Sequence, residues 1–257
     1  MKIALCLYGQ PRFINECSPY ILNNLCEGYD VDVFFHFWFD KKLQTQPYKY
    51  GGDGGWQNQR ISTSSIEDAL KIYNPKSYKV EESKSFKDST LHTDYAYYPK
   101  TAKLVPWSVH WHESGEPDYI NRIVNNNMSY HYSVNQVNLL RKEYEYANDF
   151  KYDWVVKVRS DAEPRQKIYY ENYDINVVNY TGIYNQPDGM IQDWLNFGGS
   201  KCMDIFMSTF NYIEILMEKC REDFGGAWCN EMLHRKALDL FNIDHQPHPL
   251  LITLPRF

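Results

Sequence analysis

The stretch from Phe150 to Pro164 reads Phe-Lys-Tyr-Asp-Trp-Val-Val-Lys-Val-Arg-Ser-Asp-Ala-Glu-Pro. Its centre, 154–158, is apolar and rich in β-branched residues, which predicts a strand buried on both faces. Arg159, Asp161 and Glu163 follow at alternate positions. Because burying unpaired charge is costly, we expect the strand to end at a cleft. Open α/β sheets bind their ligands at this carboxyl end of the strands.

The composition predicts one α/β domain over residues 1–257, since 43% of its 257 residues are hydrophobic. The net charge of -6 argues against a nucleic-acid partner, which a basic surface would attract. No window approaches the roughly 18 apolar residues of a spanning helix, so no membrane span is predicted. The six cysteines show no CxxC spacing, which favours reduced thiols and a cytoplasmic location.

Alternating hydrophobic patterns predict a twisted, mostly parallel sheet flanked by helices. Strands are expected at 2–8, 30–38, 78–82, 154–158 and 177–184, and helices at about 15–25, 65–73, 133–147, 200–220 and 227–240. Ser133 with Gln136, and Ser200, are interpreted as helix caps. The Gly-rich stretch 44–65 is interpreted as a loop over a site, and His110 and His112 as packing residues rather than metal ligands.

The first predicted strand runs directly into Gly9-Gln10-Pro11-Arg12. A strand that leads through a glycine turn into a helix forms a cradle for phosphate, and Arg12 is available for a diphosphate. His36 lies near the end of the next strand. The sequence leaves two interpretations of it open, a core residue or a ligand-facing one.

Asp161 and Glu163 are two positions apart, so both carboxylates can point the same way. Hard oxygen ligands in that arrangement suit Mg²⁺ or Mn²⁺ bridged to a diphosphate. The alternative is an exposed turn in which both acids pair with Arg159 and Lys157.

Two further acids are candidate catalytic bases. Asp193 lies between apolar residues, shortly before Gly198-Gly199, a pair that lets backbone approach a ligand closely. Glu231 begins a predicted helix, where it either serves as a base or favours the helix dipole. The final segment, with His245 and His248 among prolines, is either a surface tail or a lid. As a lid it makes His248 a further candidate metal ligand.

Three stretches carry a resemblance to a known family. The opening Met-Lys-Ile-Ala-Leu-Cys-Leu-Tyr-Gly-Gln-Pro-Arg, the later Asp-Val-Phe-Phe-His-Phe-Trp and Tyr-Asp-Trp-Val-Val-Lys-Val-Arg-Ser-Asp are similar to GT-A-like glycosyltransferases. Those enzymes occur in bacterial surface-polysaccharide clusters and in large DNA viruses and phages. The similarity covers residues 1–40 and 130–235, and its most specific part is the Arg-x-Asp after the buried strand.

The resemblance implies a GT-A-like (Rossmann-like) fold, with a nucleotide-binding half over about 1–165 and an acceptor-binding half over about 166–257. It implies transfer of a hexosyl or deoxyhexosyl group from a UDP- or GDP-linked donor to a glycan hydroxyl, with Mn²⁺ or Mg²⁺ as cofactor. A viral member would act in the host cytoplasm. The implied metal ligands are Asp161 and Glu163. The implied nucleotide-binding residues are Gly9, Gln10, Arg12, His36, Arg159 and Asp161, and Asp193 and Glu231 would face the acceptor.

One departure from the family pattern concerns the metal. Arg159 stands where the usual Asp-x-Asp motif has its first Asp, and a basic residue there can contact the diphosphate directly. Two other functions fit the same residues. One is a non-catalytic nucleotide- or glycan-binding protein of the same fold, and the other is a metal-dependent nucleotidyl- or phosphoryltransferase.

Overall fold

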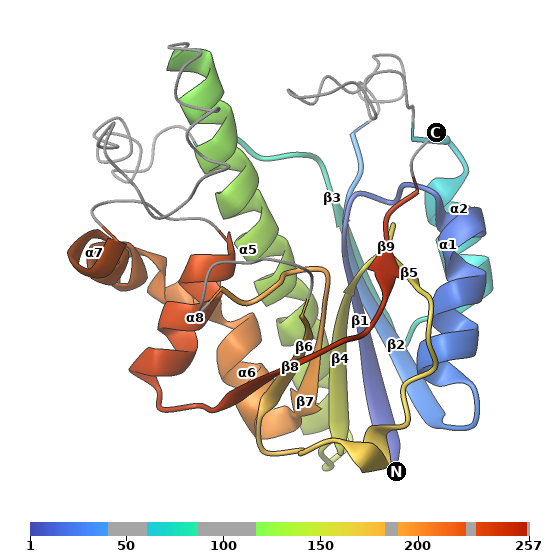
Figure 1. Ribbon diagram of the computed structural model, residues 1–257. Helices are drawn as coiled ribbons and strands as arrows, with labels where there is room; N and C mark the ends of the chain where they lie inside the picture. Colours follow the sequence, from blue (N-terminus) through green and yellow to red (C-terminus); the bar gives the residue numbers. More distant parts are fainter. Residues whose placement is uncertain (41–60, 87–116, 183–189, 225–229, 256–257) are drawn as a thin grey trace.

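A computed structural model describes residues 1–40, 61–86, 117–182, 190–224 and 230–255 (Figure 1). Within these ranges, only the backbone is described for residues 117–124 and 221–224. Most of the loop expected at 44–65 lies outside these residues. His110 and His112 do so too.

The chain forms a mixed sheet of seven strands (Figure 1). Their order across the sheet is β3 (Ser77–Glu81), β2 (Asp30–Trp38), β1 (Lys2–Gly9), β4 (Trp154–Arg159), β7 (Leu195–Gly199), β6 (Val178–Thr181) and β8 (His245–His248). β1, β2, β3 and β4 are parallel, β6 and β8 are parallel, and β7 is antiparallel to both of its neighbours. The predicted α/β class with a mostly parallel sheet is confirmed.

Helices cover both faces of this sheet. One face carries α1 (Ile14–Ile21), which continues as a π turn (Leu22–Cys26), and α2 (Ser65–Tyr73). The other carries α5 (Pro117–Ala147), α6 (Ser200–Met207) and α8 (Asn230–Leu240), and α7 (Ile213–Phe224) packs against α8. Two 3₁₀ turns (Tyr170–Asn172 and Thr209–Tyr212) and a two-stranded sheet of β5 (Glu163–Pro164) and β9 (Ile252–Thr253) complete the described elements.

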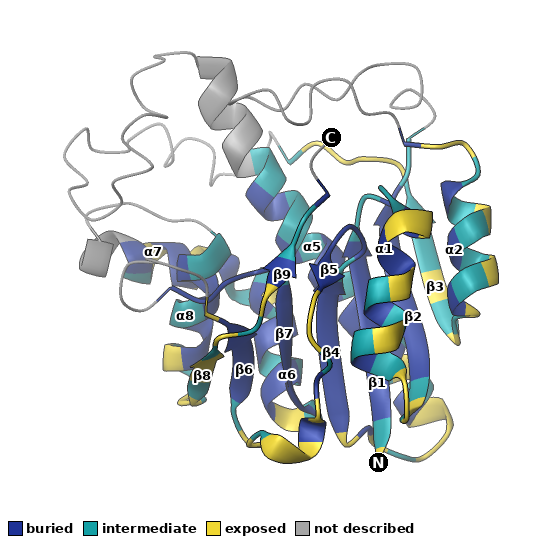
Figure 2. Cartoon of the chain, turned by 45° about the vertical axis from the view of Figure 1, so that its right-hand side comes forward, coloured by how far each residue is buried: buried dark blue, intermediate teal, exposed yellow. Residues whose placement is uncertain are grey.

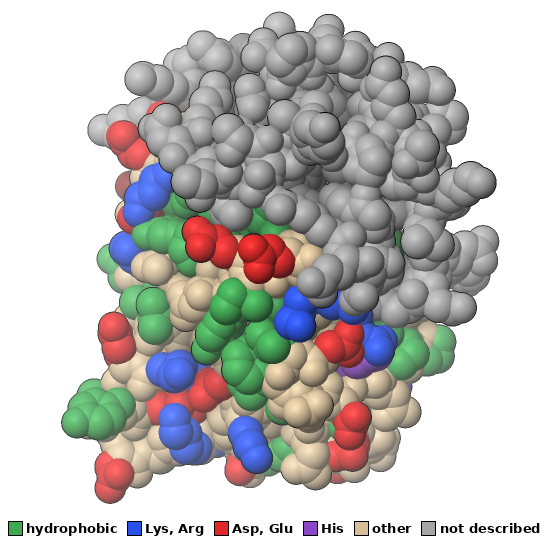
Figure 3. All heavy atoms as spheres, turned by 90° about the vertical axis from the view of Figure 1, so that its left-hand side faces the viewer, with side chains coloured by type: hydrophobic (Ala, Val, Ile, Leu, Met, Phe, Trp, Pro, Cys, Tyr) green, Lys and Arg blue, Asp and Glu red, His purple; other side chains and the backbone are tan. Residues whose placement is uncertain are grey.

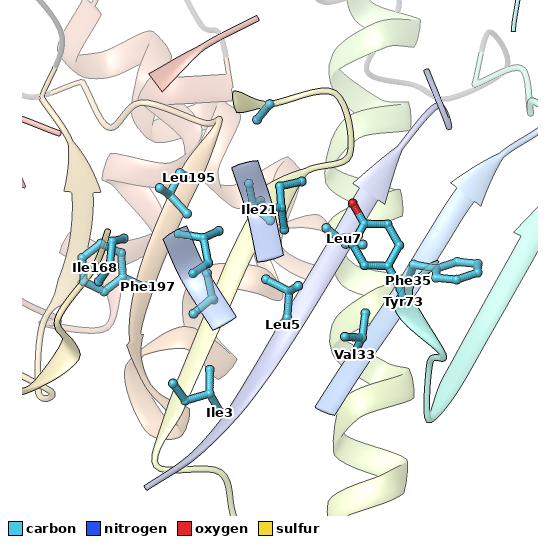
Figure 4. Close-up of a cluster of buried hydrophobic side chains, with 14 of the residues drawn as sticks. Ile3, Leu5, Leu7, Ile21, Val33, Phe35, Tyr73, Ile168, Leu195 and Phe197 are labelled. Carbon is cyan, nitrogen blue, oxygen red and sulfur yellow. The ribbon is translucent and has the colours of Figure 1, made fainter. Parts of the chain in front are cut away.

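The core follows the two-residue period of the strands. Ile3, Leu5 and Leu7 of β1 lie on the α1–α2 face, where Figure 4 shows them beside Ile21 and Tyr73. Residues 4, 6 and 8 of the same strand pack against α5 and α6. The central strands are therefore buried on both sides (Figure 2), as a parallel sheet between two helix layers requires.

Two predicted helix caps are wrong. The helix expected to begin at Ser133 begins at Pro117, so Ser133 lies in its interior and its hydroxyl bonds to other elements. Ser200 is the first residue of α6 after Gly199, and its hydroxyl donates to the Tyr152 carbonyl over 2.7 Å. The single helix expected over 200–220 is broken by the 3₁₀ turn at Thr209–Tyr212.

The glycine pair and the C-terminal histidines also differ from expectation. Gly198 and Gly199 lie within β7, where an added Cβ would come within 2.6 Å of the Val177 carbonyl and 2.7 Å of the Ile175 carbonyl, respectively. Their small size therefore permits backbone packing, not the approach of a ligand. His245–His248 is neither a tail nor a lid but the edge strand β8, paired with β6.

Candidate functional site

The order in which the chain adds strands to the sheet reverses between β1 and β4. From β1 the chain steps outward through β2 to β3, and it then returns to β4 on the opposite side of β1. Such a switch point leaves a crevice at the carboxyl ends of the two parallel strands. Because β7 is antiparallel, its first residue, Leu195, pairs with Val158 at this same edge. Residues 9–12, 159–161 and 193–194 therefore meet there.

Asp161 lies between two arginines at this edge of the sheet. Its Oδ1 accepts from Arg159 Nε and its Oδ2 from Arg159 Nη2, each over 2.9 Å, and Arg12 Nη2 lies 3.0 Å from Oδ2. Burial alone would raise the pKa of Asp161, but the two guanidinium groups outweigh burial and hold that pKa below its usual value. The same contacts keep the pKa of Arg159 above its usual value despite burial. Asp161 is therefore an ionised carboxylate with both oxygens engaged.

The glycine turn after β1 is held from two directions. Gly9 has a φ of 101°, a conformation that glycine adopts without strain. Its N–H donates to Ser133 Oγ over 3.2 Å, and the Gln10 carbonyl accepts from Ser160 Oγ over 2.7 Å. The Oε1 of Gln10 is buried, and within the described residues it accepts no hydrogen bond. This turn thus lies against the residues that follow β4.

His36 supports the turn and does not face the crevice. The ring is fully buried, with Nδ1 2.8 Å from Ser133 Oγ and Nε2 2.9 Å from Glu81 Oε2. Burial lowers the pKa of His36 to about 4, so the ring is neutral at pH 7. Nε2 then donates to the carboxylate, and Nδ1 accepts from the Ser133 hydroxyl. Of the two interpretations of His36, the structure favours the core residue.

Asp193 and the first turn of α8, which carries Glu231, lie close together. Asp193 Oδ2 accepts from Asn230 Nδ2 over 3.3 Å, and the Ile191 N–H donates to the Glu231 carbonyl over 3.3 Å. The start of α8 is thereby aligned with the segment that leads into β7. Burial lowers the pKa of Arg159, whereas Asp161, Tyr8 and, after them, Asp193 raise it. Asp193 therefore lies near the switch point, with the start of α8 beside it.

Lys157 fixes this arrangement, a role that the sequence pattern did not indicate. Its side chain is fully buried, and Nζ donates to the Asp193 carbonyl over 2.6 Å and to Asn196 Oδ1 over 2.7 Å. Tyr8 donates to the same carbonyl over 2.5 Å. Burial lowers the pKa of Lys157 to about 7, although Asp193 and Glu231 oppose that shift. The signal in the sequence is the placing of Lys157 between two valines inside an apolar strand.

The exposed-turn interpretation of Asp161 and Glu163 is right in one contact, because Asp161 pairs with Arg159. It is wrong about exposure, since both acids are buried. Lys157 bonds to Asp193 and Asn196 instead of pairing with either acid.

The other two predicted metal ligands have partners elsewhere. Glu163 lies in β5, where it is ion-paired with Arg165 and accepts from Thr253 Oγ1 over 2.7 Å. His248 lies in β8, with Nε2 2.8 Å from Asn179 Oδ1 and its ring 4.7 Å from that of Tyr173. Within the described residues, no three His, Cys, Asp or Glu side chains form a group that could hold a metal ion. The donors around Asp161 therefore do not fit a divalent cation in the arrangement described.

The surface of the protein carries mixed charge. On the face in Figure 3, lysine and arginine side chains are interspersed with carboxylates. On α8, for example, Arg235 and Lys236 both pair with Asp239. None of the helices in the described part of the chain combines the length and apolar character needed to cross a bilayer.

Neither a protein-family model nor a curated protein matches this chain.

Proposed function

We propose that this protein transfers a sugar from a UDP- or GDP-linked donor to a hydroxyl group of a glycan. The observation that carries the proposal is a pair of arginine side chains at the switch point of the sheet, with Asp193 and the start of α8 close by. Arginine forks match the geometry of phosphate oxygens. Open α/β sheets bind nucleotides at this position. The sequence resemblance to GT-A-like glycosyltransferases supports the same class of reaction.

The proposed chemistry divides the site into two parts. The Gly9–Arg12 turn and Arg159 would hold the diphosphate and offset the charge that develops as it leaves. Asp193 or Glu231 would accept the proton of the acceptor hydroxyl as its oxygen bonds to the anomeric carbon. The bond between that carbon and the diphosphate oxygen breaks in the same step. The nucleoside diphosphate departs with the bonding electron pair.

The test is a transfer assay with a panel of nucleotide sugars and glycan acceptors. If one carboxylate is the base, either Asp193→Asn or Glu231→Gln should lower the transfer rate by about 10²-fold or more. Nucleoside diphosphate binding should be kept in that variant. Glu171→Gln is the control, because Glu171 is an exposed carboxylate that accepts from Tyr29. Full transfer by both site variants would refute the assigned base.

The products of the same assay separate the alternatives. Nucleotide-sugar binding without turnover would indicate a non-catalytic binding protein. Release of pyrophosphate or of a nucleoside monophosphate would indicate a nucleotidyltransferase. Release of a nucleoside diphosphate together with a glycosylated acceptor is the expected result.

A further inference from the structure

We propose that Arg12 and Arg159 bind the diphosphate directly, and that Asp161 is a positioning residue that orients both guanidinium groups in place of a metal ligand. Nucleotide binding then needs no divalent cation at Asp161. The identity of the ligand as a nucleoside diphosphate rests on the proposed function. The way its charge is offset follows from the arrangement of these three side chains.

The first observation is that both oxygens of the Asp161 carboxylate are engaged by guanidinium groups. Both oxygens accept from Arg159, and Oδ2 is also paired with Arg12. A guanidinium carries five N–H donors. Arg159 directs Nε and Nη2 to Asp161, and its Nη1 makes no hydrogen bond to another described residue. The carboxylate thus fixes the plane of Arg159 while donors remain for a second acceptor.

The second observation is the order of burial. The Asp161 side chain is 3% exposed, whereas those of Arg12 and Arg159 are 16% and 22% exposed. A ligand that approaches from solvent therefore meets the guanidinium groups before the carboxylate. A metal ligand would need the opposite order, with the carboxylate oxygens facing the ligand.

The third observation is the sum of the charges. Arg12, Arg159 and Asp161 alone carry a net charge of about +1, and their guanidinium groups are the part that attracts an anionic diphosphate. A divalent cation at Asp161 would lie next to both guanidinium groups and would have to displace their hydrogen bonds. The other predicted acid of the motif, Glu163, is ion-paired with Arg165. The three side chains thus favour direct recognition of phosphate.

Calorimetry on the full chain tests the proposal. Inorganic pyrophosphate is titrated in EDTA, and UDP and GDP are titrated both in EDTA and in Mn²⁺. We expect pyrophosphate to bind in EDTA, and the preferred nucleotide to bind with similar affinity in both buffers. Arg12→Gln and Arg159→Gln should each weaken binding roughly ten- to a hundredfold, because each removes charge-assisted hydrogen bonds. Arg165→Gln is the control, since Arg165 pairs with Glu163 outside the crevice.

Arg159 is the last residue of β4, so its loss can also harm folding. Arg159→Lys keeps the charge without the planar fork and should still weaken binding. Thermal unfolding of each variant shows that the fold is intact. Arg12 lies in the turn and provides a test that does not change the strand.

Two results would overturn the proposal. One is nucleotide binding that appears only with Mn²⁺. The other is a chain that binds neither pyrophosphate nor any nucleoside diphosphate. Turnover of nucleotide sugar is measured separately, so the two proposals can fail independently. Binding in EDTA without turnover would support diphosphate binding by the arginine pair and refute the transfer reaction. Binding that requires Mn²⁺, together with turnover, would support the transfer reaction and refute metal-free binding by the arginine pair.

Discussion

The backbone N–H of Gly9 donates to the hydroxyl of Ser133 over 3.2 Å, across 124 residues of sequence. The contact joins the turn after the central strand to the interior of the longest helix. His36 Nδ1 lies 2.8 Å from the same hydroxyl. One serine side chain thus links β1, β2 and α5 directly behind the candidate nucleotide cradle.

Ser133→Ala should destabilise the protein by about 1–3 kcal/mol, because the half-buried Gly9 N–H and the buried His36 ring each lose a partner. Nucleotide affinity should fall as well, since the turn is no longer held. Chemical denaturation and calorimetry measure the two effects. Ser129→Ala, one helical turn earlier, is the control for the loss of a hydroxyl from this helix. Equal stability of the two variants would contradict a bridging role for Ser133.

Gly9→Ala should cost about 1–3 kcal/mol through backbone strain alone. The φ of Gly9 is 101°, and an added Cβ would meet no atom within 4 Å. Gly28 is a matched control, with a φ of 90° and equally open space, in the turn before β2. Both variants should lose similar stability, and only Gly9→Ala should also weaken nucleotide binding. A comparable loss of binding in Gly28→Ala would show that the effect is global.

Lys157→Met should change how stability depends on pH. The pKa of Lys157 is about 7 in the folded chain, against an ordinary value of 10.5. Between these values the unfolded chain binds a proton that the folded chain does not. The free energy of unfolding therefore rises with pH, by about 1.4 kcal/mol per unit for this one group. Below pH 7 that contribution is constant.

Urea unfolding of both proteins between pH 7 and 8.5 measures this difference. The methionine variant should show the smaller slope. Lys71→Met removes an exposed lysine of α2 and should leave the slope unchanged. The assigned ionisation fails if wild type and Lys157→Met have parallel pH profiles.

His131→Leu should reduce acid sensitivity without loss of stability at pH 7. His131 is buried in α5, and neither ring nitrogen has a hydrogen-bond partner in the described part of the chain. Burial lowers its pKa to about 3 from 6.5. As pH falls below 6.5, the unfolded chain takes up a proton that the folded chain refuses, so stability falls between pH 6.5 and 3. Replacing the ring with leucine removes this contribution to the loss of stability at low pH.

The measurement is thermal unfolding at pH 7 and pH 5 for wild type and His131→Leu, with His248→Leu as a contrast. His248 is hydrogen-bonded to Asn179, so its loss should destabilise the protein at pH 7. A His131→Leu protein that is much less stable at pH 7 would show that the ring nitrogens do have partners.

Strong local patterns allowed much of the sheet to be predicted. The strand at 30–38 and the helix at 65–73 have the predicted bounds, because an unbroken apolar run and a regular helical period leave little ambiguity. β7 was missed because two of its five residues are glycines, which favour a turn in isolation. β8 was missed because it contains a proline, which only an edge strand tolerates.

Part of the site could also be predicted from local sequence patterns. Arg12, Arg159 and Asp161 were identified because charges directly after apolar strands must reach a cleft. Which of them pair depends on strand order, and no local pattern contains that information. Ser133 and Lys157 were given other roles, because the partners they contact in the fold lie 124 and 36 residues away in the sequence.

The pairing of β5 with β9 affects when the region beyond Asp161 can form. Thr253 bonds to Glu163 across 90 residues of chain, whereas β1, β2 and β4 meet through the central sheet. β5 and β9 are joined by only two residue pairs, whereas β1 and β4 are joined by six. We therefore expect refolding to build the central sheet and the arginine pair first, and to pair residues 163–164 with β9 afterwards. Stopped-flow folding and unfolding of Thr253→Val test this expectation. If the contact forms late, its loss should raise the unfolding rate and leave the folding rate unchanged.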